Sequence, residues 1–220
     1  MNQVSAHIPP HWSATLWLII IGLFCLIGLR ARWRMLMVPA NLNVFLAATV
    51  VVLGLWLIRT GIRPGLDFHL LGATLLTLMF RPWFALLALA LVCALLTTHN
   101  GEFNAYPANL LIMGALPVTV SWLIYRLADS RLPNHLFIYI FINGFLGGAL
   151  SIAATGIAAT LFATLTNSYT PAYLLDEYLP FYLLMAWAEG LSTGMITTLL
   201  VIYRPEWVAT FDDRRYLNAR

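Results

Sequence analysis

The chain has 220 residues, of which 61% are apolar and only 10% are charged. Soluble domains carry roughly a quarter charged residues, so this composition excludes an ordinary soluble domain and indicates an all-α, polytopic membrane protein. The net charge of +3 comes from twelve arginines without any lysine. These arginines sit at the ends of apolar runs, where they set membrane topology, so they do not indicate nucleic-acid binding.

A membrane span needs about 20 apolar residues, so the length of each apolar run decides the assignment. We expect an N-terminal segment, 1–12, outside the membrane, a transmembrane domain, 13–203, and a cytoplasmic tail, 204–220. Seven spans are predicted, in chain order, over residues 13–29, 42–58, 67–80, 83–96, 110–125, 135–165 and 179–202. No basic region precedes the first run and no A-x-A pattern follows it, so we expect a permanent span that is not cleaved.

Individual segments carry further expectations. Ser13 is a candidate N-cap for the first span. The third span, beginning at Asp67, is short and ends at the turn Arg81-Pro82. Residues 97–109 form the most polar loop, and a second loop covers 167–177. In the long sixth span, the glycines at 144, 147 and 148 allow another helix to approach closely.

The arginines predict the orientation of the spans. With seven spans, ten arginines fall on one side of the membrane, and only Arg59 and Arg63 fall on the other. The positive-inside rule then places the N-terminus outside and the C-terminus in the cytoplasm.

Histidines gather on the predicted outer side. The most informative stretch is 65–74, which places Asp67 and His69 at the mouth of an apolar run, and His7, His11 and His99 fall on the same side. Neutral imidazole is the commonest ligand for nickel, cobalt, copper and zinc. The pattern indicates a transition-metal site, although topology alone leaves chance clustering equally open.

Glu189 lies in the middle of the seventh predicted span. A carboxylate at that depth must be paired, protonated or in contact with water. Three roles stay open from sequence: a hydrogen bond that locks helices together, a contact along a transport path, or internal packing alone. Among these we favour a structural role.

The sequence contains no motif that indicates an enzymatic activity. The chain has no phosphate-binding loop of the Walker type, so it does not hydrolyse nucleotide itself. It also lacks the Gly-x-Ser-x-Gly and His-Glu-x-x-His patterns of hydrolases and metalloproteases. The two cysteines, Cys25 and Cys93, lie inside apolar runs and are expected to be small buried hydrophobic residues.

Four short motifs in order resemble the CbiM/NikM family, the membrane substrate-binding components of cobalt and nickel energy-coupling-factor transporters. They are His7-Ile8-Pro9, Phe68-His69-Leu70-Leu71-Gly72, Pro107-Ala108-Asn109, and Ala188-Glu189-Gly190 with Gly194. Each motif is weak alone, but together they span nearly the whole chain. The resemblance implies a multi-pass protein of the bacterial inner membrane.

The resemblance also implies a metal site. In that family nitrogens bind the metal: the terminal amine, the backbone nitrogen and imidazole of the adjacent His, and a second imidazole. These roles carry over to His69 and to His7, with Asn100 or Asn109 bracing the site. In this chain His7 lies six residues from the start. Either the chain is trimmed before residue 6 or 7, or the site uses the imidazoles of His7, His11, His69 and His99.

We therefore expect a substrate-capture subunit for Co²⁺ or Ni²⁺, with Zn²⁺ as a third candidate. The resemblance implies a separate transmembrane coupling protein and cytosolic ATPase subunits as partners. Two alternatives stay open: a metal sensor or assembly factor of the same fold that does not transport, and a specificity subunit for an organic vitamin.

Overall fold

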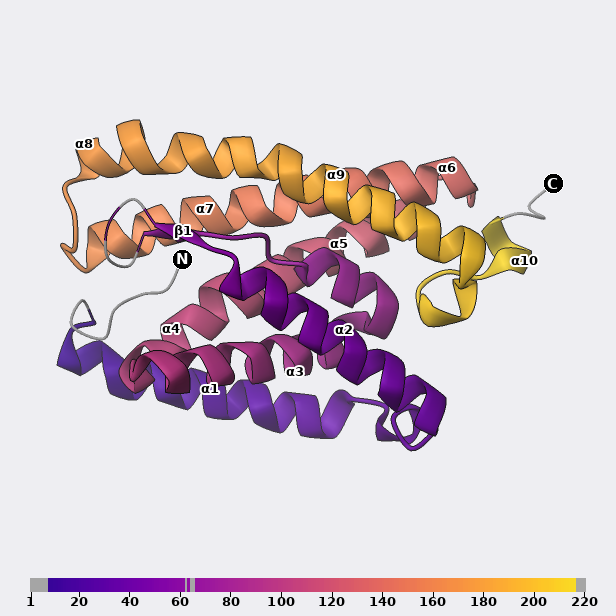
Figure 1. Cartoon of the computed structure of the whole chain (residues 1–220), viewed down its shortest axis with the longest axis horizontal. Helices are drawn as coiled ribbons and strands as arrows, with labels where there is room; N and C mark the ends of the chain where they lie inside the picture. The colour runs from indigo at the N-terminus through magenta and orange to yellow at the C-terminus, as the bar shows by residue number, and fades with distance from the viewer. Residues whose placement is uncertain (1–7, 62, 64–65, 217–220) are drawn as a thin grey trace.

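The computed structural model describes residues 8–61, 63 and 66–216. The described chain is almost entirely helical, with a bundle of long helices running roughly alongside one another (Figure 1). Six helical stretches within this part are long and apolar enough to cross a membrane; they are Pro10–Arg30, Pro39–Leu57, Ala73–Asn100, Phe103–Arg131, Leu136–Leu165 and Pro171–Tyr203. The prediction of a multi-pass helical membrane protein is confirmed.

The first half of the chain contains α1 (Pro10–Arg30), α2 (Pro39–Leu57), the two-residue strands β1 (Thr60–Gly61) and β2 (Asp67–Phe68), and α3 (Ala73–Asn100). A short 3₁₀ turn, Trp33–Met35, connects α1 to α2. Both α1 and α2 begin at a proline, whose fixed φ suits the first helical turn. The prediction of an N-cap at Ser13 is wrong because the helix already starts at Pro10.

The second half is built from helices that are interrupted by π-helical turns. A 3₁₀ turn, Phe103–Ala105, leads into α4 (Tyr106–Leu110), which continues through Leu111–Ala115 into α5 (Leu116–Arg131). The next stretch joins α6 (Leu136–Ile138) through Tyr139–Leu146 to α7 (Gly147–Leu165). The last joins α8 (Pro171–Tyr173) through Leu174–Tyr178 to α9 (Leu179–Tyr203), followed by the turn Pro205–Trp207 and α10 (Asp213–Tyr216).

Both predicted polar loops are shorter than expected. Residues 97–100 belong to α3, and residues 171–177 are helical. Thr97 and Thr98 remain helical because their hydroxyls donate to carbonyls of the preceding turn, at Cys93 (2.6 Å) and Ala94 (2.8 Å). These bonds give both hydroxyls an acceptor within the helix, and α3 stops only at Gly101, which has φ 71°.

The third predicted span is the main correction to the fold. Helix does not begin at Asp67: residues 67–72 are non-helical, and α3 starts at Ala73. Within α3 the backbone leaves the helical region at Arg81 (φ 63°, ψ 170°), before Pro82. The arms 73–80 and 82–100 therefore meet at a kink, beside which Phe45 packs against both Phe80 and Phe84. That 67–80 makes a crossing of its own, so that the chain crosses seven times, stays a prediction.

The short arm 73–80 is capped at its C-terminal end by the segment after α9. The backbone N–H groups of Ala209 and Thr210 donate to the carbonyls of Met79 (3.0 Å) and Leu78 (3.2 Å). The Thr210 hydroxyl also donates to Leu78 O at 2.7 Å. Carbonyls at a helix end have no intrahelical partner, so these bonds allow an eight-residue helix to end inside the protein.

The glycines of the sixth predicted span allow close packing, as expected. A Cβ on Gly144 would lie 3.2 Å from the Cα of Gly194, and one on Gly148 would lie 3.2 Å from the Cα of Gly190. The helix that approaches is therefore α9. This contact sets Glu189, the neighbour of Gly190, against the centre of the bundle.

The two ends of the described chain lie at opposite ends of the bundle (Figure 1). Ile8 packs against Ala105 and Ala108 at the start of the stretch 103–131. At the other end of that stretch, the Tyr216 hydroxyl donates to Asp129. The number of crossings stays a prediction. Which end faces outward stays a prediction.

Candidate metal-capture site around His69

The segment between β2 and α3 carries His69 into the interior. Leu66, Phe68, His69 and Leu71 are all buried, and His69 is only 7% exposed. The segment ends at Gly72, which has φ 65° and lies against Val52 of α2. A positive φ suits glycine because it has no Cβ. Helix therefore cannot begin before Ala73, and His69 is presented on a buried loop.

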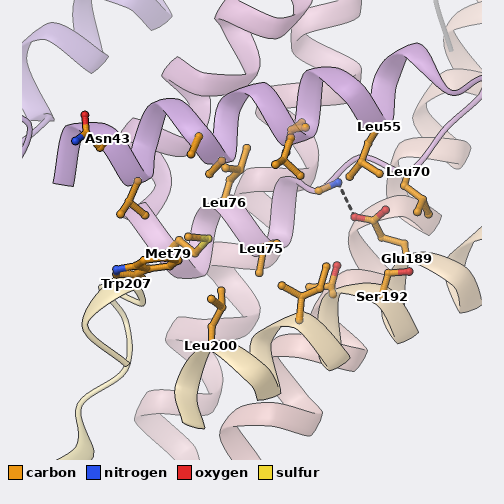
Figure 2. A pocket seen from close by; sticks show the side chains of 18 residues that line it. Asn43, Leu55, Leu70, Leu75, Leu76, Met79, Glu189, Ser192, Leu200 and Trp207 are labelled. Atoms are coloured by element: carbon orange, nitrogen blue, oxygen red, sulfur yellow. Dashed lines mark hydrogen bonds between the residues drawn. The ribbon is translucent and has the colours of Figure 1, made fainter. Parts of the chain in front are cut away.

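Glu189 of α9 fixes the end of this loop. Its two carboxylate oxygens accept hydrogen bonds from the backbone N–H groups of Leu71 and Gly72, both at 2.8 Å. The carboxylate is 1% exposed and stands at the N-terminus of α3, where the helix dipole favours negative charge. Figure 2 shows Glu189 directed at this turn. The arrangement is a hydrogen bond that locks two elements; a contact along a transport path stays a prediction.

Trp56, at the end of α2, fixes the loop from the other side. Its indole N–H donates to Leu71 O at 3.0 Å. Its ring also lies against the His69 imidazole, with centroids 4.7 Å apart at 42°. Leu71 is thus held at both its N–H and its carbonyl, two residues beyond His69. The loop has little freedom to change its backbone.

The hydrogen bonding of His69 sets its tautomer. Nδ1 lies 3.1 Å from Leu70 O, and since a carbonyl only accepts, Nδ1 carries the proton. Burial lowers the pKa of His69 well below its ordinary value, so the ring is neutral at pH 7. The lone pair of a neutral ring with this tautomer is on Nε2, the atom that would bind a metal ion. A backbone carbonyl behind the ring is the usual support for a metal-binding histidine.

An aromatic group forms the other wall of the loop. The Phe68 ring packs against Tyr178, Phe181 and Tyr182, with centroids 5.2 to 5.7 Å apart. Thr74, just inside α3, adds polar contacts to the hydroxyls of Ser121 and Ser151 at 2.5 and 3.0 Å. The loop and the first turn of α3 are therefore attached to α5, α7 and α9.

Asp67 lies on β2 and, within the described chain, does not belong to a group of side chains that could hold a metal ion. It pairs with Arg59 at 3.3 Å, and both side chains are partly exposed. The strands β1 and β2 are antiparallel, with Gly61 opposite Asp67. This ion pair closes the hairpin that leads into the His69 loop. Its free-energy contribution is small, about 0–1 kcal/mol.

The remaining predicted ligands lie in different places. His11 is exposed on the first turn of α1, edge-on to Trp12 at 6.3 Å. His99 is exposed at the end of α3, with Nδ1 3.4 Å from Asn100 Oδ1. His7 lies outside the described residues. Within the described chain, no three His, Cys, Asp or Glu side chains are grouped to hold a metal ion.

The N-terminal segment nevertheless reaches the same end of the bundle as the His69 loop. Trp12 packs against Phe162 of α7 with ring centroids 5.8 Å apart. Six residues earlier on α7, Gly156 lies directly beneath the Tyr182 side chain, which contacts Phe68. Six helical residues correspond to about 9 Å. The first described residues therefore lie near the His69 loop.

Asn109 is placed differently from Asn100. Asn109 is buried on α4, next to Ala108, which packs against Ile8. Asn100 is half-buried at the last position of α3 beside the exposed His99. Of the two predicted bracing residues, Asn109 is therefore the one buried beside the N-terminal segment.

Two supporting residues were not singled out from the sequence. Trp56 was one more aromatic residue in an apolar span, and Thr74 was one more small polar residue. Neither position carries a local signal, since each depends on partners far along the chain: Leu71 for Trp56, and Ser121 and Ser151 for Thr74.

Comparisons with known proteins agree with this fold. A family model described as the cobalt uptake substrate-specific transmembrane region matches residues 5–207. A solved structure of a truncated transition metal transporter superposes with a TM-score of 0.80 at 19% identity, covering 92% of this chain and 99% of that chain. A second transition metal transporter gives 0.78 at 19% identity, covering 91% and 92%. No curated protein sequence matches significantly.

Proposed function

This chain belongs to the CbiM family, and on that premise we propose that it is the substrate-capture subunit of an energy-coupling-factor transporter for a divalent transition metal. The family description, cobalt uptake, favours Co²⁺ as the substrate. Ni²⁺ and Zn²⁺ are the other candidates, because all three ions bind imidazole nitrogen.

One observation carries the proposal: a neutral, buried His69 on a loop whose backbone is held from both sides. Leu71 and Gly72 are fixed by Glu189, and Leu71 is fixed again by Trp56. Such support keeps a ligand oriented before the metal arrives, so binding costs little reorganisation. Ionisable groups are rarely placed at this depth without a functional reason.

The other donors would come from the N-terminal segment. Ile8, the first described residue, is buried beside the helix that carries Asn109. This favours a site built from the N-terminal segment and His69 over one built from four imidazoles, since His11 and His99 are both exposed. Glu189 and Asp67 would support the loop without binding the metal.

The mechanism would begin with capture of the ion from outside, beneath the N-terminal segment. The whole subunit would then reorient in the membrane. A transmembrane coupling protein and cytosolic ATPase subunits would supply the energy, so this chain is not itself an enzyme. We place it in the bacterial inner membrane with seven crossings, the N-terminus outside and the tail 204–220 in the cytoplasm, as the distribution of arginines favours.

Elemental analysis of detergent-purified protein tests the proposal. The protein is loaded with equal concentrations of nickel, cobalt and zinc, washed and measured as wild type, His69→Ala and His135→Ala. His135 is exposed at the start of α6, where its side chain accepts a hydrogen bond from the nearby Phe137 N–H, so it is the matched control. We expect one equivalent of metal in wild type and control, and its loss in His69→Ala.

Equal metal in wild type and His69→Ala would overturn the assignment of His69. Retained metal binding without metal uptake by cells that carry the coupling protein and ATPases would instead support a sensor or assembly factor. The family match supports metal over an organic vitamin as the ligand.

A further inference from the structure

A large cavity opens at the end of the bundle opposite the β1–β2 hairpin. It has a volume of about 1230 Å³ and lies between α1, the turn after α1, α3 and α5. Pockets for small molecules typically measure about 300–1,000 Å³. The cavity therefore has room for a ligand larger than an ion, and nothing in the proposed metal capture uses it.

The interior of the cavity is apolar. Phe84 and Leu86 of α3 and Val118 of α5 are all buried along it. Towards its open side, Leu26 of α1 and Leu123 of α5 remain largely exposed. An apolar channel between helices that opens towards the membrane surface of the bundle suits a hydrocarbon chain.

The mouth of the cavity is basic. Arg30, Arg32, Arg34 and Arg81 all line it, and all four are exposed. Salt bridges in the described chain pair Arg59, Arg204 and Arg215 with carboxylates, and none involves these four. Four cationic groups therefore converge on one opening, without a carboxylate partner among the described residues.

Hydrogen bonds and a ring contact hold the turn that carries Arg32 and Arg34. The indole N–H of Trp33 donates to Gly28 O at 3.0 Å, and its ring packs edge-on to Phe84 with centroids 5.7 Å apart. Asn41 donates to Met35 O at 3.1 Å. Arg81 donates through Nε and a terminal nitrogen to Ala209 O. The arginines are thus presented from fixed turns around the cavity.

We propose that this cavity binds an anionic phospholipid. The phosphate would lie among Arg30, Arg32, Arg34 and Arg81, and an acyl chain would lie along Phe84 and Val118. Guanidinium groups bind phosphate oxygens through paired, charge-assisted hydrogen bonds. Basic pockets between membrane helices are suited to the headgroups of anionic lipids.

The combination of features selects a lipid over other occupants. A free phosphate would match the arginines but leave the apolar interior empty. An apolar helix from a partner protein would cover the interior but leave four charges without compensation. Only an amphiphile with a negative headgroup matches both parts of the cavity.

Native mass spectrometry of the purified full-length protein tests the proposal. The probes are phosphatidylglycerol, phosphatidylcholine with the same chains, and glycerol phosphate. Arg32→Ala/Arg34→Ala removes two charges from the mouth. Arg204→Ala/Arg214→Ala removes two exposed charges that do not line the cavity, so it is matched in net charge. Thr119→Trp fills the cavity from an exposed position while keeping every arginine.

We expect one phosphatidylglycerol to bind in preference to phosphatidylcholine, with affinity reduced about tenfold or more in Arg32→Ala/Arg34→Ala. Arg204→Ala/Arg214→Ala should bind as wild type does, and Thr119→Trp should lose the lipid. An equal loss in both arginine variants would overturn the proposal, because the effect would then be one of net charge. Binding of glycerol phosphate as tight as that of lipid would identify a phosphate site instead. Should Arg32→Ala/Arg34→Ala fail to fold, unchanged binding in Thr119→Trp would still contradict a lipid in the cavity.

Discussion

The two ends of the molecule treat their polar groups differently. At the end with the His69 loop, buried groups are paired inside the protein: Glu189 accepts from Leu71 and Gly72, and Trp56 donates to Leu71. At the arginine-rich end, the charges of Arg30, Arg32 and Arg34 are exposed around an open cavity. We propose that the first end holds a metal ion at this supported loop and that the second end binds an anionic lipid.

The largest expected effect comes from removing the Glu189 carboxylate. Glu189→Ala leaves two buried N–H groups without an acceptor, so it should lower the free energy of unfolding by about 2–4 kcal/mol and abolish metal binding. Chemical unfolding in detergent measures the loss. Glu206→Ala, which removes an exposed partner of Arg204, is the control and should cost less than about 1 kcal/mol. Equal losses of unfolding free energy in the two variants would contradict the difference between the buried, paired groups of one end and the exposed charges of the other.

A glycine pair tests whether the His69 loop needs its backbone conformation. Gly72 has φ 65°, and a Cβ there would lie 3.0 Å from Val52. Gly72→Ala should therefore destabilise the protein by about 1–2 kcal/mol. Gly54 lies within α2 with no heavy atom near its Cβ position, so Gly54→Ala should stabilise by about 0.5–1 kcal/mol. Thermal unfolding of both variants gives the comparison, and the same sign for both would contradict it.

Two tryptophans make the same hydrogen bond at the two ends. Trp56 and Trp33 each donate to a backbone carbonyl at 3.0 Å, but the first bond is buried and the second exposed. Trp56→Phe should cost about 1–2 kcal/mol, because Leu71 O loses its buried donor, and should weaken metal binding severalfold. Trp33→Phe should stay within about 0.5 kcal/mol of wild type and keep its metal. A larger loss of stability in Trp33→Phe than in Trp56→Phe would contradict the difference between the buried and the exposed hydrogen bond.

The smallest expected effect is a pH dependence of stability. Burial lowers the pKa of His69 in the folded protein, so the unfolded chain takes up a proton first as the pH falls. Stability should therefore decrease below the unfolded pKa of about 6.5. Unfolding curves at pH 7 and pH 5 should show this decrease in wild type and in His99→Gln, whose histidine is exposed. His69→Gln should show a smaller decrease in stability. An identical decrease would mean that His69 is not responsible for the pH dependence.

The helical membrane architecture could be predicted from sequence because apolar run length and proline position are local properties. The predicted loops were too long, since Thr97 and Thr98 bond back to their own helix and stay helical. The third span was misjudged for a different reason. Its apolar residues satisfy a length rule, but Gly72 and Arg81 adopt positive φ, and non-helical backbone inside the protein is stabilised only by distant partners.

The candidate site, like the fold, could be predicted from the sequence only in part. His69 and Glu189 were visible as ionisable residues in apolar surroundings, which is a signal that sequence carries. Their connection was not visible, because Glu189 and Leu71 are 118 residues apart. The supposed gathering of His11 and His99 with His69 rested on membrane side alone. Sharing a side of the membrane does not bring side chains into contact.

X-ray absorption spectroscopy at the metal edge tests the central claim most directly. The metal-loaded wild type should show nitrogen ligands with the multiple-scattering pattern of imidazole, and His69→Ala should lose at least one imidazole or lose the metal. His99→Ala, in which an exposed histidine is removed, should leave the spectrum unchanged. A spectrum that is the same in wild type and His69→Ala would show that the His69 loop does not hold the metal.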